Sequence, residues 1–167
     1  MLLIFLKRLL QMLGLMALQV LVCNHIHLFG YATPMLYVLF LAYLPLNANR
    51  IGSLLWAFVL GLSVDIFSNT FGAAAAALTF AAFVQWPLLQ AWAPKESVED
   101  MVPTYQTMGV WNHIRYLAVL ATVHHLVFYL LESFSYFHWE SLLISVGSSL
   151  LLSLVLMLTI DSLRHGK

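Results

Sequence analysis

The sequence predicts an all-α polytopic membrane protein, a bundle of six transmembrane helices with both termini in the cytoplasm. Hydrophobic residues make up 62% of the chain and charged residues only 8%, whereas a soluble domain has about 45–50% and about 25%. Six apolar runs approach the length of about 20 residues that a helical crossing needs. All seven Lys and Arg residues fall in alternate connections between these runs, as the positive-inside rule requires.

The six runs follow one another with little sequence between them. Lys7 and Arg8 precede the first run, and Pro34 and Pro45 flank the core of the second. The third and fourth are joined by only a few residues, which predicts a tight antiparallel hairpin. The sixth run contains no charged residue. The runs are Leu9–Cys23, Leu28–Leu46, Ile51–Asn69, Ala73–Trp92, Tyr116–Leu131 and Ser141–Ile160.

The basic residues also predict the orientation. With six crossings and a cytoplasmic N-terminus, the outer connections at 24–33, 68–72 and 132–140 contain no Lys or Arg. We therefore expect residues 1–167 to form one helical bundle and residues 93–113 to form a cytoplasmic loop. The expected cytoplasmic basic residues are Lys7, Arg8, Arg50, Lys95, Arg115, Arg164 and Lys167.

Charge and cysteine content exclude several classes of function. Seven basic and seven acidic residues balance, and no basic cluster is present that could neutralise a series of phosphates, so nucleic-acid binding is not expected. Cys23 is the single cysteine, which excludes an internal disulfide and a cysteine-based zinc site. We expect no cofactor and no metal. We expect the protein to be surrounded by lipid.

Two stripes of small or hydroxyl-bearing residues follow helical spacing. Along the third run every fourth residue is small, and the stripe ends at a carboxylate. Helix packing explains such stripes, because small residues let backbones approach and hydroxyls add interhelical hydrogen bonds. A polar lining for a solute path is the alternative. The stripes are Ser53, Ala57, Gly61 and Asp65, and Ser141, Ser145, Ser148, Ser149 and Ser153.

Asp65 is the first candidate for a special role. Counting from Ile51 places it about 21 Å into a hydrocarbon core about 30 Å thick. An acid within the membrane indicates function by default. The alternative is structural, because Asp65 could hold the turn formed by Ser68, Asn69 and Thr70 through local hydrogen bonds.

The fifth run supplies a second polar group near the membrane midplane. His124 and His125 are adjacent and point about 100° apart, so a regular helix cannot direct both at one metal. His125, Tyr129 and Glu132 share a face and could serve a metal site or a proton relay. Hydrogen bonding between helices is the simpler interpretation, and Gln19 in the first run is a further candidate for such a contact.

The stretch from Gly61 to Leu78 resembles the MreD family of bacterial rod-shape-determining membrane proteins. The family pattern is a Gly, an apolar run, an Asp, a polar turn, a second Gly and a helix of small residues. Gly61, Asp65, Gly72 and Ala73 occupy these places. Phe71 departs from the pattern, since a Pro or Leu is more usual in that turn. Chain length and the six-span layout are also similar.

The resemblance implies a non-enzymatic scaffold in the cytoplasmic membrane of a bacterium, within the cell-wall elongation machinery that determines cell shape. Its implied partners are MreC and, directly or through it, the actin-like filament protein, a glycan polymerase and a transpeptidase. The family is also similar in helix arrangement to substrate-binding subunits of energy-coupling-factor vitamin transporters. A substrate-capturing membrane subunit is therefore the alternative function.

Three classes of function make different predictions about the interior. A scaffold predicts faces that bury another helix and no polar cavity. A transport subunit predicts an outward-facing pocket lined by polar and aromatic side chains. An enzyme predicts titratable residues that converge in a cleft open to water. No nucleophile, base and orienting group occur at recognisable spacing, so we do not expect an enzyme.

Overall fold

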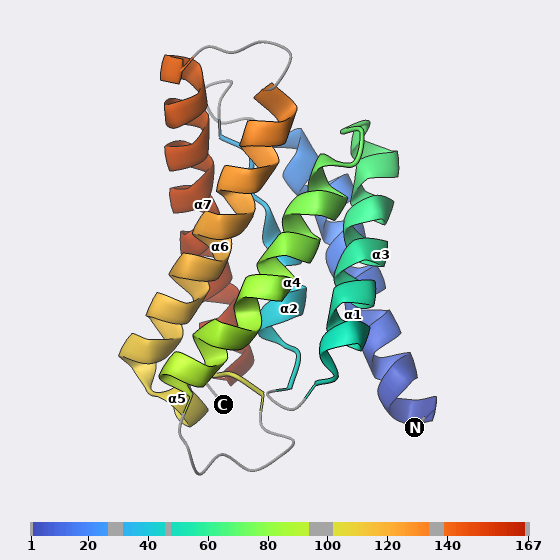
Figure 1. Ribbon diagram of the computed structural model, residues 1–167, viewed down its shortest axis with the longest axis vertical. Coiled ribbons are helices and arrows are strands. Elements are labelled where there is room, and N and C mark those ends of the chain that lie inside the picture. Colours follow the sequence, from blue (N-terminus) through green and yellow to red (C-terminus); the bar gives the residue numbers. More distant parts are fainter. Residues whose placement is uncertain (1, 27–31, 46–47, 94–101, 134–138, 166–167) are drawn as a thin grey trace.

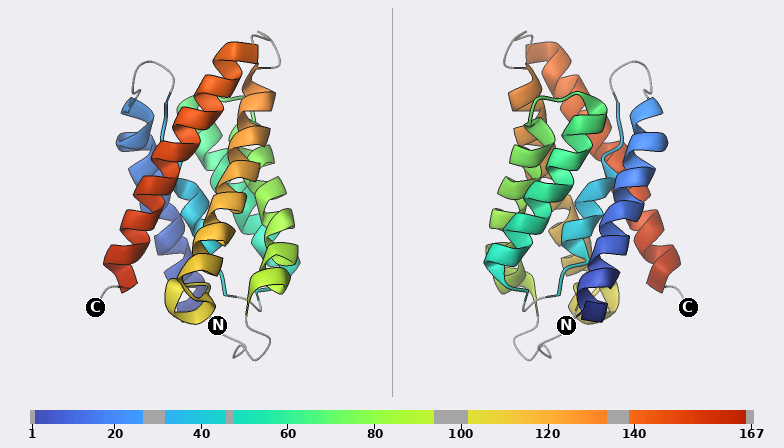
Figure 2. Two further views of the ribbon diagram at one scale, coloured as in Figure 1. Left: turned by 90° about the vertical axis from the view of Figure 1, so that its left-hand side faces the viewer. Right: turned by 90° about the vertical axis from the view of Figure 1, so that its right-hand side faces the viewer.

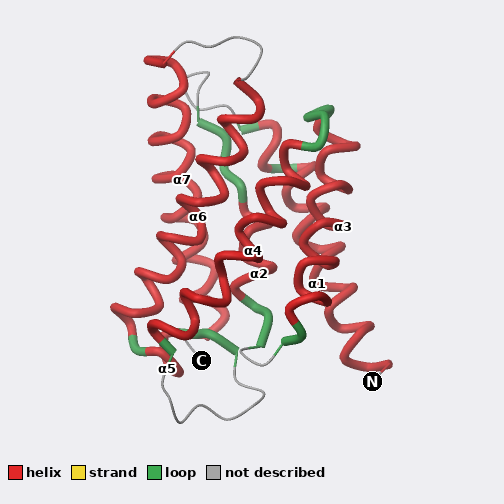
Figure 3. Tube along the Cα trace, viewed as in Figure 1, coloured by secondary structure: helices red, strands yellow, loops and turns green. Residues whose placement is uncertain are grey.

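The computed structural model describes residues 2–26, 32–45, 48–93, 102–133 and 139–165. The elements named within these ranges are all helices (Figure 3). Five of the described segments are helical and, by length and composition, long and apolar enough to cross a membrane, which is consistent with a multi-pass membrane protein. These segments are Leu2–His25, Arg50–Ser68, Ala73–Trp92, Val110–Glu132 and Leu142–Arg164.

Short helical turns accompany the long helices. Two 3-10 turns, Cys23–His25 and Leu36–Val38, and the short helix α2 lie between α1 and α3, and α5 lies between α4 and α6. The α-helices are α1 (Leu2–Leu21), α2 (Leu39–Ala42), α3 (Arg50–Ser68), α4 (Ala73–Trp92), α5 (Tyr105–Met108), α6 (Val110–Glu132) and α7 (Trp139–His165).

The long helices run roughly parallel or antiparallel, so the bundle has two ends (Figures 1 and 2). The first turn of α1 and the last turn of α7 lie at one end, together with α5; we call it the terminal end. The turn that joins α3 to α4 lies at the other, the hairpin end. Every described Lys and Arg lies in the part of its helix nearer the terminal end: Lys7, Arg8, Arg50, Arg115 and Arg164.

The expectation of a sixth long helix over Leu28–Leu46 is wrong for the described part of that run. Residues 33–35 have no helical structure, Leu36–Val38 form a 3-10 turn, and α2 is only one turn long. The two prolines explain this difference. Pro34 has no N–H to donate and disfavours helical backbone at Thr33, and Pro45 disfavours it at the residue before it.

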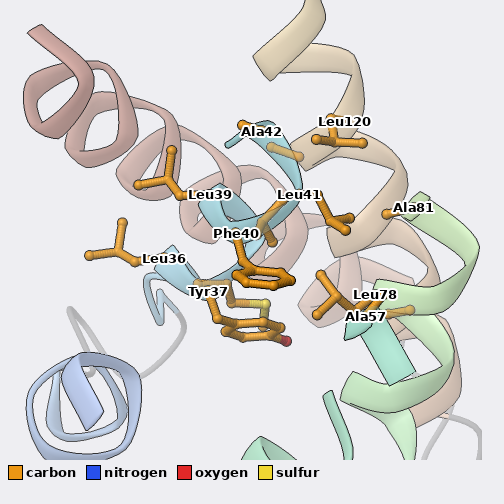
Figure 4. Packing of buried hydrophobic residues seen from close by; sticks show 14 of the residues in the cluster. Leu36, Tyr37, Leu39, Phe40, Leu41, Ala42, Ala57, Leu78, Ala81 and Leu120 are labelled. Carbon is orange, nitrogen blue, oxygen red and sulfur yellow. The ribbon is translucent and has the colours of Figure 1, made fainter. Parts of the chain in front are cut away.

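This segment, residues 32–45, still runs between the two ends of the bundle (Figures 1 and 3). It lies inside the protein, because the residues from Leu36 to Ala42 are each at most 4% exposed. In Figure 4 its side chains are surrounded by Ala57 of α3, Leu78 of α4 and Leu120 of α6. A run that is apolar on every side therefore reflects burial in protein rather than contact with lipid.

The cytoplasmic loop expected at 93–113 is wrong at its C-terminal boundary. Thr104 caps α5 with its side chain, and Gly109 separates α5 from α6 with a φ of +79°. Helix α6 then begins at Val110, so that His113 lies in its first turns. Glycine tolerates this left-handed backbone without steric cost, which lets a new helix begin immediately. Pro94 and Lys95 lie outside the described residues.

The helices pack in a consistent order. The α3–α4 pair shares the largest interface, followed by α4–α6 and then α6–α7. Helix α1 contacts α3 and the buried segment, and it is the most exposed of the long helices, whereas α4 is the most buried. The alanine-rich start of α4 explains its position, because small residues let both neighbours approach closely.

Candidate functional site

Helices α3 and α4 approach each other closely at Gly61. A Cβ atom added at Gly61 would stand 2.5 Å from the Cα of Ala75 and 2.6 Å from the carbonyl oxygen of Ala74. Both contacts are with backbone, which cannot move aside as a flexible side chain can. The small stripe of α3 therefore includes, at Gly61, a position that only glycine can occupy at this helix separation.

Asp65 lies one turn further along α3 and is 4% exposed. Its Oδ1 accepts hydrogen bonds from the Thr70 hydroxyl and from the Ala74 N–H, the latter at 2.9 Å. Its Oδ2 accepts from the Ala75 N–H at 2.8 Å. The carboxylate thus satisfies two of the free N–H groups in the first turn of α4, where a negative charge also interacts favourably with the helix dipole.

The turn between the two helices supports this arrangement. Asn69 ends α3 in the left-handed conformation with φ of 57°, and Gly72 precedes Ala73, the first residue of α4, with φ of 89°. Gly72 has no side chain to cap α4, so Asp65 performs that task from the preceding helix. The four residues of the sequence pattern, Gly61, Asp65, Gly72 and Ala73, form one structural unit, which we call the hairpin clamp.

A second set of polar contacts holds the buried non-helical segment. Gln19 of α1 is 2% exposed; its Nε2 donates to the carbonyl oxygen of Pro34 at 2.9 Å and to Asn24 Oδ1 at 3.0 Å. Its Oε1 accepts from the Leu36 N–H at 2.9 Å. One amide side chain therefore replaces two backbone partners that a regular helix would have supplied.

The serine stripe of α7 satisfies the same segment from the other side. Ser149 Oγ accepts from the Thr33 N–H at 3.0 Å, and Ser153 Oγ accepts from the Met35 N–H at 2.9 Å. Both serines are fully buried. For Ser149 and Ser153, these contacts match the interpretation of the serine stripe as a packing face whose hydroxyls add hydrogen bonds to neighbouring parts of the protein. Ser148, by contrast, donates to the Ile144 carbonyl of its own helix, and the side chain of Ser141 lies outside the described set.

His125 and Tyr129 of α6 complete these serine contacts. His125 Nδ1 lies 2.7 Å from the Ala121 carbonyl oxygen, and its Nε2 lies 2.9 Å from Ser153 Oγ. The carbonyl can only accept, so Nδ1 carries a proton and donates it to Ala121. Tyr129 pairs with Ser149 at 2.6 Å. The His125–Ser153 and Tyr129–Ser149 contacts join α6 to α7 and are the interhelical hydrogen bonds that the simpler interpretation of His125 describes.

In the described part of the chain, no hydrogen bond joins Glu132 to His125 or Tyr129, although Glu132 and Tyr129 line the same cavity. Glu132 is exposed at the end of α6, whereas the histidine and the tyrosine are buried. His124 is also fully buried, stacks near Phe128 and meets the ring of Tyr37 edge-on. Among the described residues, no three His, Cys, Asp or Glu side chains are close enough together to hold a metal ion.

Sequence reasoning missed two buried polar contacts nearer the terminal end. Gln85 of α4 donates to the Leu41 carbonyl oxygen at 2.8 Å and to the Tyr116 hydroxyl at 3.0 Å. His113 Nε2 lies 2.8 Å from Asp161 Oδ2, and both side chains are about 3% exposed. Gln85, isolated in an apolar run, and Asp161, an acid directly after another apolar run, were visible in the sequence. Their hydrogen-bond partners are distant in the chain, and no neighbouring residue indicated them.

A cavity of about 580 Å³ opens at the hairpin end, between α1, α3, α6, α7 and the start of the buried segment. It combines polar with aromatic walls. The residues that matter below are Gln19, Asn24, Tyr37, Phe128, Tyr129 and Glu132. Its size falls in the range of about 300–1,000 Å³ that small-molecule sites occupy.

A second, more apolar pocket of about 360 Å³ lies between α3 and α4 towards the terminal end. The guanidinium of Arg50 stands 3.2 Å from the centre of the Trp86 ring, and both residues line this pocket. Its walls are mostly apolar. Comparison of the chain with protein families, with curated proteins and with solved structures finds no match.

Proposed function

We propose that this protein is a non-enzymatic scaffold subunit of the bacterial cell-wall elongation machinery, similar to MreD. The hairpin clamp is the observation that supports the proposal. Gly61 and Asp65 both contact Ala74 and Ala75 in the first turn of α4, directly after Gly72 and Ala73, so the pattern on which the resemblance depends falls on the region that joins α3 to α4. A rigid helix pair is what a subunit needs in order to present a fixed surface to partners.

The proposed location is the cytoplasmic (inner) membrane of a bacterium, with the terminal end facing the cytoplasm. Every described Lys and Arg lies towards that end, and cytoplasmic loops collect such residues. With residues 32–45 as a buried crossing that is not a long helix, the chain would cross six times. Non-helical backbone is tolerated at membrane depth when it is buried in protein.

Labelling of introduced cysteines tests the orientation. In a Cys23→Ala background, Phe71→Cys places a thiol at a position that is 98% exposed on the hairpin turn. Ser162→Cys places one at an exposed position near the end of α7. An impermeant thiol reagent added outside intact cells should label Phe71→Cys alone. Labelling of Ser162→Cys instead would reverse the orientation, and labelling of both would contradict the six crossings.

Copurification with MreC tests the scaffold function. The tagged wild-type chain, solubilised in mild detergent with MreC from the same bacterium, should retain MreC through size-exclusion chromatography. Asp65→Ala should lose MreC in proportion to its loss of folded protein, and Ser63→Ala should retain it, because Ser63 bonds only to Val59 of its own helix. A monodisperse, folded wild-type chain that never retains MreC would overturn the proposal.

A substrate-capturing transporter subunit is the second candidate, and the cavity at the hairpin end favours it. Its wall combines Gln19, Asn24 and Glu132 with Tyr37 and Phe128, and the scaffold hypothesis predicted no polar cavity. Such a subunit would associate with a membrane coupling protein and its ATPases. Recovery of that assembly in place of MreC, in the same purification, would decide for the second candidate.

A further inference from the structure

The cavity at the hairpin end has polar groups of two kinds. Some are already committed to contacts within the protein. Gln19 bonds to Asn24, Asn24 Nδ2 donates to Ser68 Oγ at 2.6 Å, and the Thr70 hydroxyl donates to Asp65. These groups form a fixed wall and have little remaining capacity for a ligand.

Two other lining groups are not committed. Tyr37 lines the cavity and is 1% exposed, yet its hydroxyl has no hydrogen-bond partner among the described residues. A buried hydroxyl without a partner is costly, and a ligand that accepts its hydrogen bond would remove that cost. Glu132 lines the same cavity, and no described Lys or Arg forms an ion pair with it.

The charge around the cavity has one sign. The connections at 24–33, 68–72 and 132–140 contain no Lys or Arg, whereas Glu132 and Glu140 lie at this end. An uncompensated carboxylate beside a low-dielectric interior favours a cation. The histidine that lines the cavity, His25, is exposed, and no hydrogen bond or ion pair joins it to Glu132 among the described residues.

Aromatic rings supply the rest of the recognition. Tyr37, Phe67, Phe128 and Tyr129 all line the cavity. Ring faces attract ammonium groups through their quadrupole, and quaternary or methylated ammonium ions are commonly recognised in this way. A carboxylate beside several rings is complementary to an organic cation, and it repels anions.

From this geometry we infer that the cavity binds an organic cation. The ammonium group of the ligand would lie next to Glu132, and its apolar body would lie among the aromatic rings. An oxygen of the ligand would accept a hydrogen bond from the Tyr37 hydroxyl. The cation is either a free amine or the ammonium headgroup of a lipid. The inference deepens the second candidate function. Binding of the cation does not require that function, but a role in its transport rests on it. A scaffold could hold the same group without moving it.

The first arm of the test uses a free cation. Thermal unfolding of the purified full chain in neutral detergent is followed with increasing choline, and with 3,3-dimethylbutan-1-ol as the neutral molecule of the same shape. Choline should raise the unfolding temperature in a saturable way, and the neutral analogue should not. The second arm measures which phospholipid remains bound in native mass spectrometry, phosphatidylethanolamine or phosphatidylglycerol.

Matched variants assign the binding to the cavity. Glu132→Gln should weaken binding of choline or of phosphatidylethanolamine by about tenfold, since a charge-assisted hydrogen bond is worth at least about 1.4 kcal/mol. Glu140→Gln removes the same charge at the same end from a residue that does not line the cavity, and should bind as wild type. Tyr37→Phe keeps the ring and should weaken binding by a smaller factor.

Each outcome has a definite meaning. A choline response alone identifies a soluble amine, and selective retention of phosphatidylethanolamine alone identifies a lipid headgroup. If the folded wild type shows neither, or if Glu132→Gln and Glu140→Gln bind equally, the inference is overturned. Neither result affects MreC copurification, so a failure here is distinct from a failure of the scaffold proposal.

Discussion

The hairpin clamp and the buried segment at residues 32–45 solve the same problem in opposite ways. Each contains backbone N–H groups without an intrahelical partner, in a protein whose surroundings offer little water. In the clamp one carboxylate, from Asp65, bonds residues five to ten positions away in sequence. In the segment, neutral side chains reach the backbone from three separate helices, through Gln19, Gln85, Ser149 and Ser153.

The difference lies in how far the partners are apart in the chain. Asp65 and Ala75 are neighbours in one helical hairpin, so the clamp can form as soon as α3 and α4 meet. Thr33 and Ser149 are 116 positions apart, and Met35 and Ser153 are 118 apart. The clamp is therefore a local unit, whereas the segment depends on assembly of the whole bundle. Stability measurements on the two regions can test this contrast.

The largest effect is expected at the helix contact within the clamp. Gly61→Leu forces a side chain into the backbone of α4, where a Cβ alone would already be 2.5 Å from Ala75. We expect loss of most folded protein, measured as the monodisperse peak in fluorescence-detected size-exclusion chromatography. Gly14→Leu is the control, because Gly14 has no atom within 4 Å of an added Cβ. Equal yields would remove this contact from the clamp.

Next in size is Asp65→Ala. It leaves the Thr70 hydroxyl and the N–H groups of Ala74 and Ala75 without their acceptor, at about 1–3 kcal/mol for each buried donor. Asp65→Asn keeps one oxygen but turns an NH₂ group toward a remaining donor, so it should be intermediate in thermal stability in detergent. An Asn variant as stable as wild type but unable to retain MreC would show that the charge itself has a function.

A smaller loss is expected in the buried segment for Gln19→Leu. It removes the partners of the Pro34 carbonyl and the Leu36 N–H, an expected cost of about 2–4 kcal/mol in unfolding free energy. Gln11→Leu is the control on the same helix, because none of the hydrogen bonds described above involves Gln11. If both variants unfold at the same temperature, Gln19 does not hold the segment.

The smallest effect is expected for Ser153→Ala, about 1 kcal/mol. It removes the acceptor of the Met35 N–H and the partner of His125 Nε2, although the backbone of a short segment can adjust to some of this loss. Ser148→Ala, whose hydroxyl bonds only within its own helix, should be neutral. Thermal unfolding of the two variants in parallel gives the comparison, and a neutral Ser153→Ala would argue against a role for α7 in positioning the segment.

The sequence predicted the local unit better than the distributed one. Spacing and residue size were sufficient to identify Gly61 as a close-packed position and to relate Asp65 to the turn after it, because both features are local. The run at Leu28–Leu46 was apolar enough for a helix, and its prolines were visible. Its burial could not be foreseen, because it depends on residues as distant as Gln85 and Ser153, whose partners no local pattern reveals.

The dependence of residues 33–36 on α7 has a consequence for biosynthesis. When the ribosome has produced α1 through α4, the N–H groups of Thr33 and Met35 still lack Ser149 and Ser153, which are translated more than a hundred residues later. A buried amide without a partner is costly, so these two N–H groups reach their buried positions with their acceptors only once α7 has been made. The hydrogen bonds that hold this buried segment are then completed last, after the final helix has been made, although the segment lies between α1 and α3.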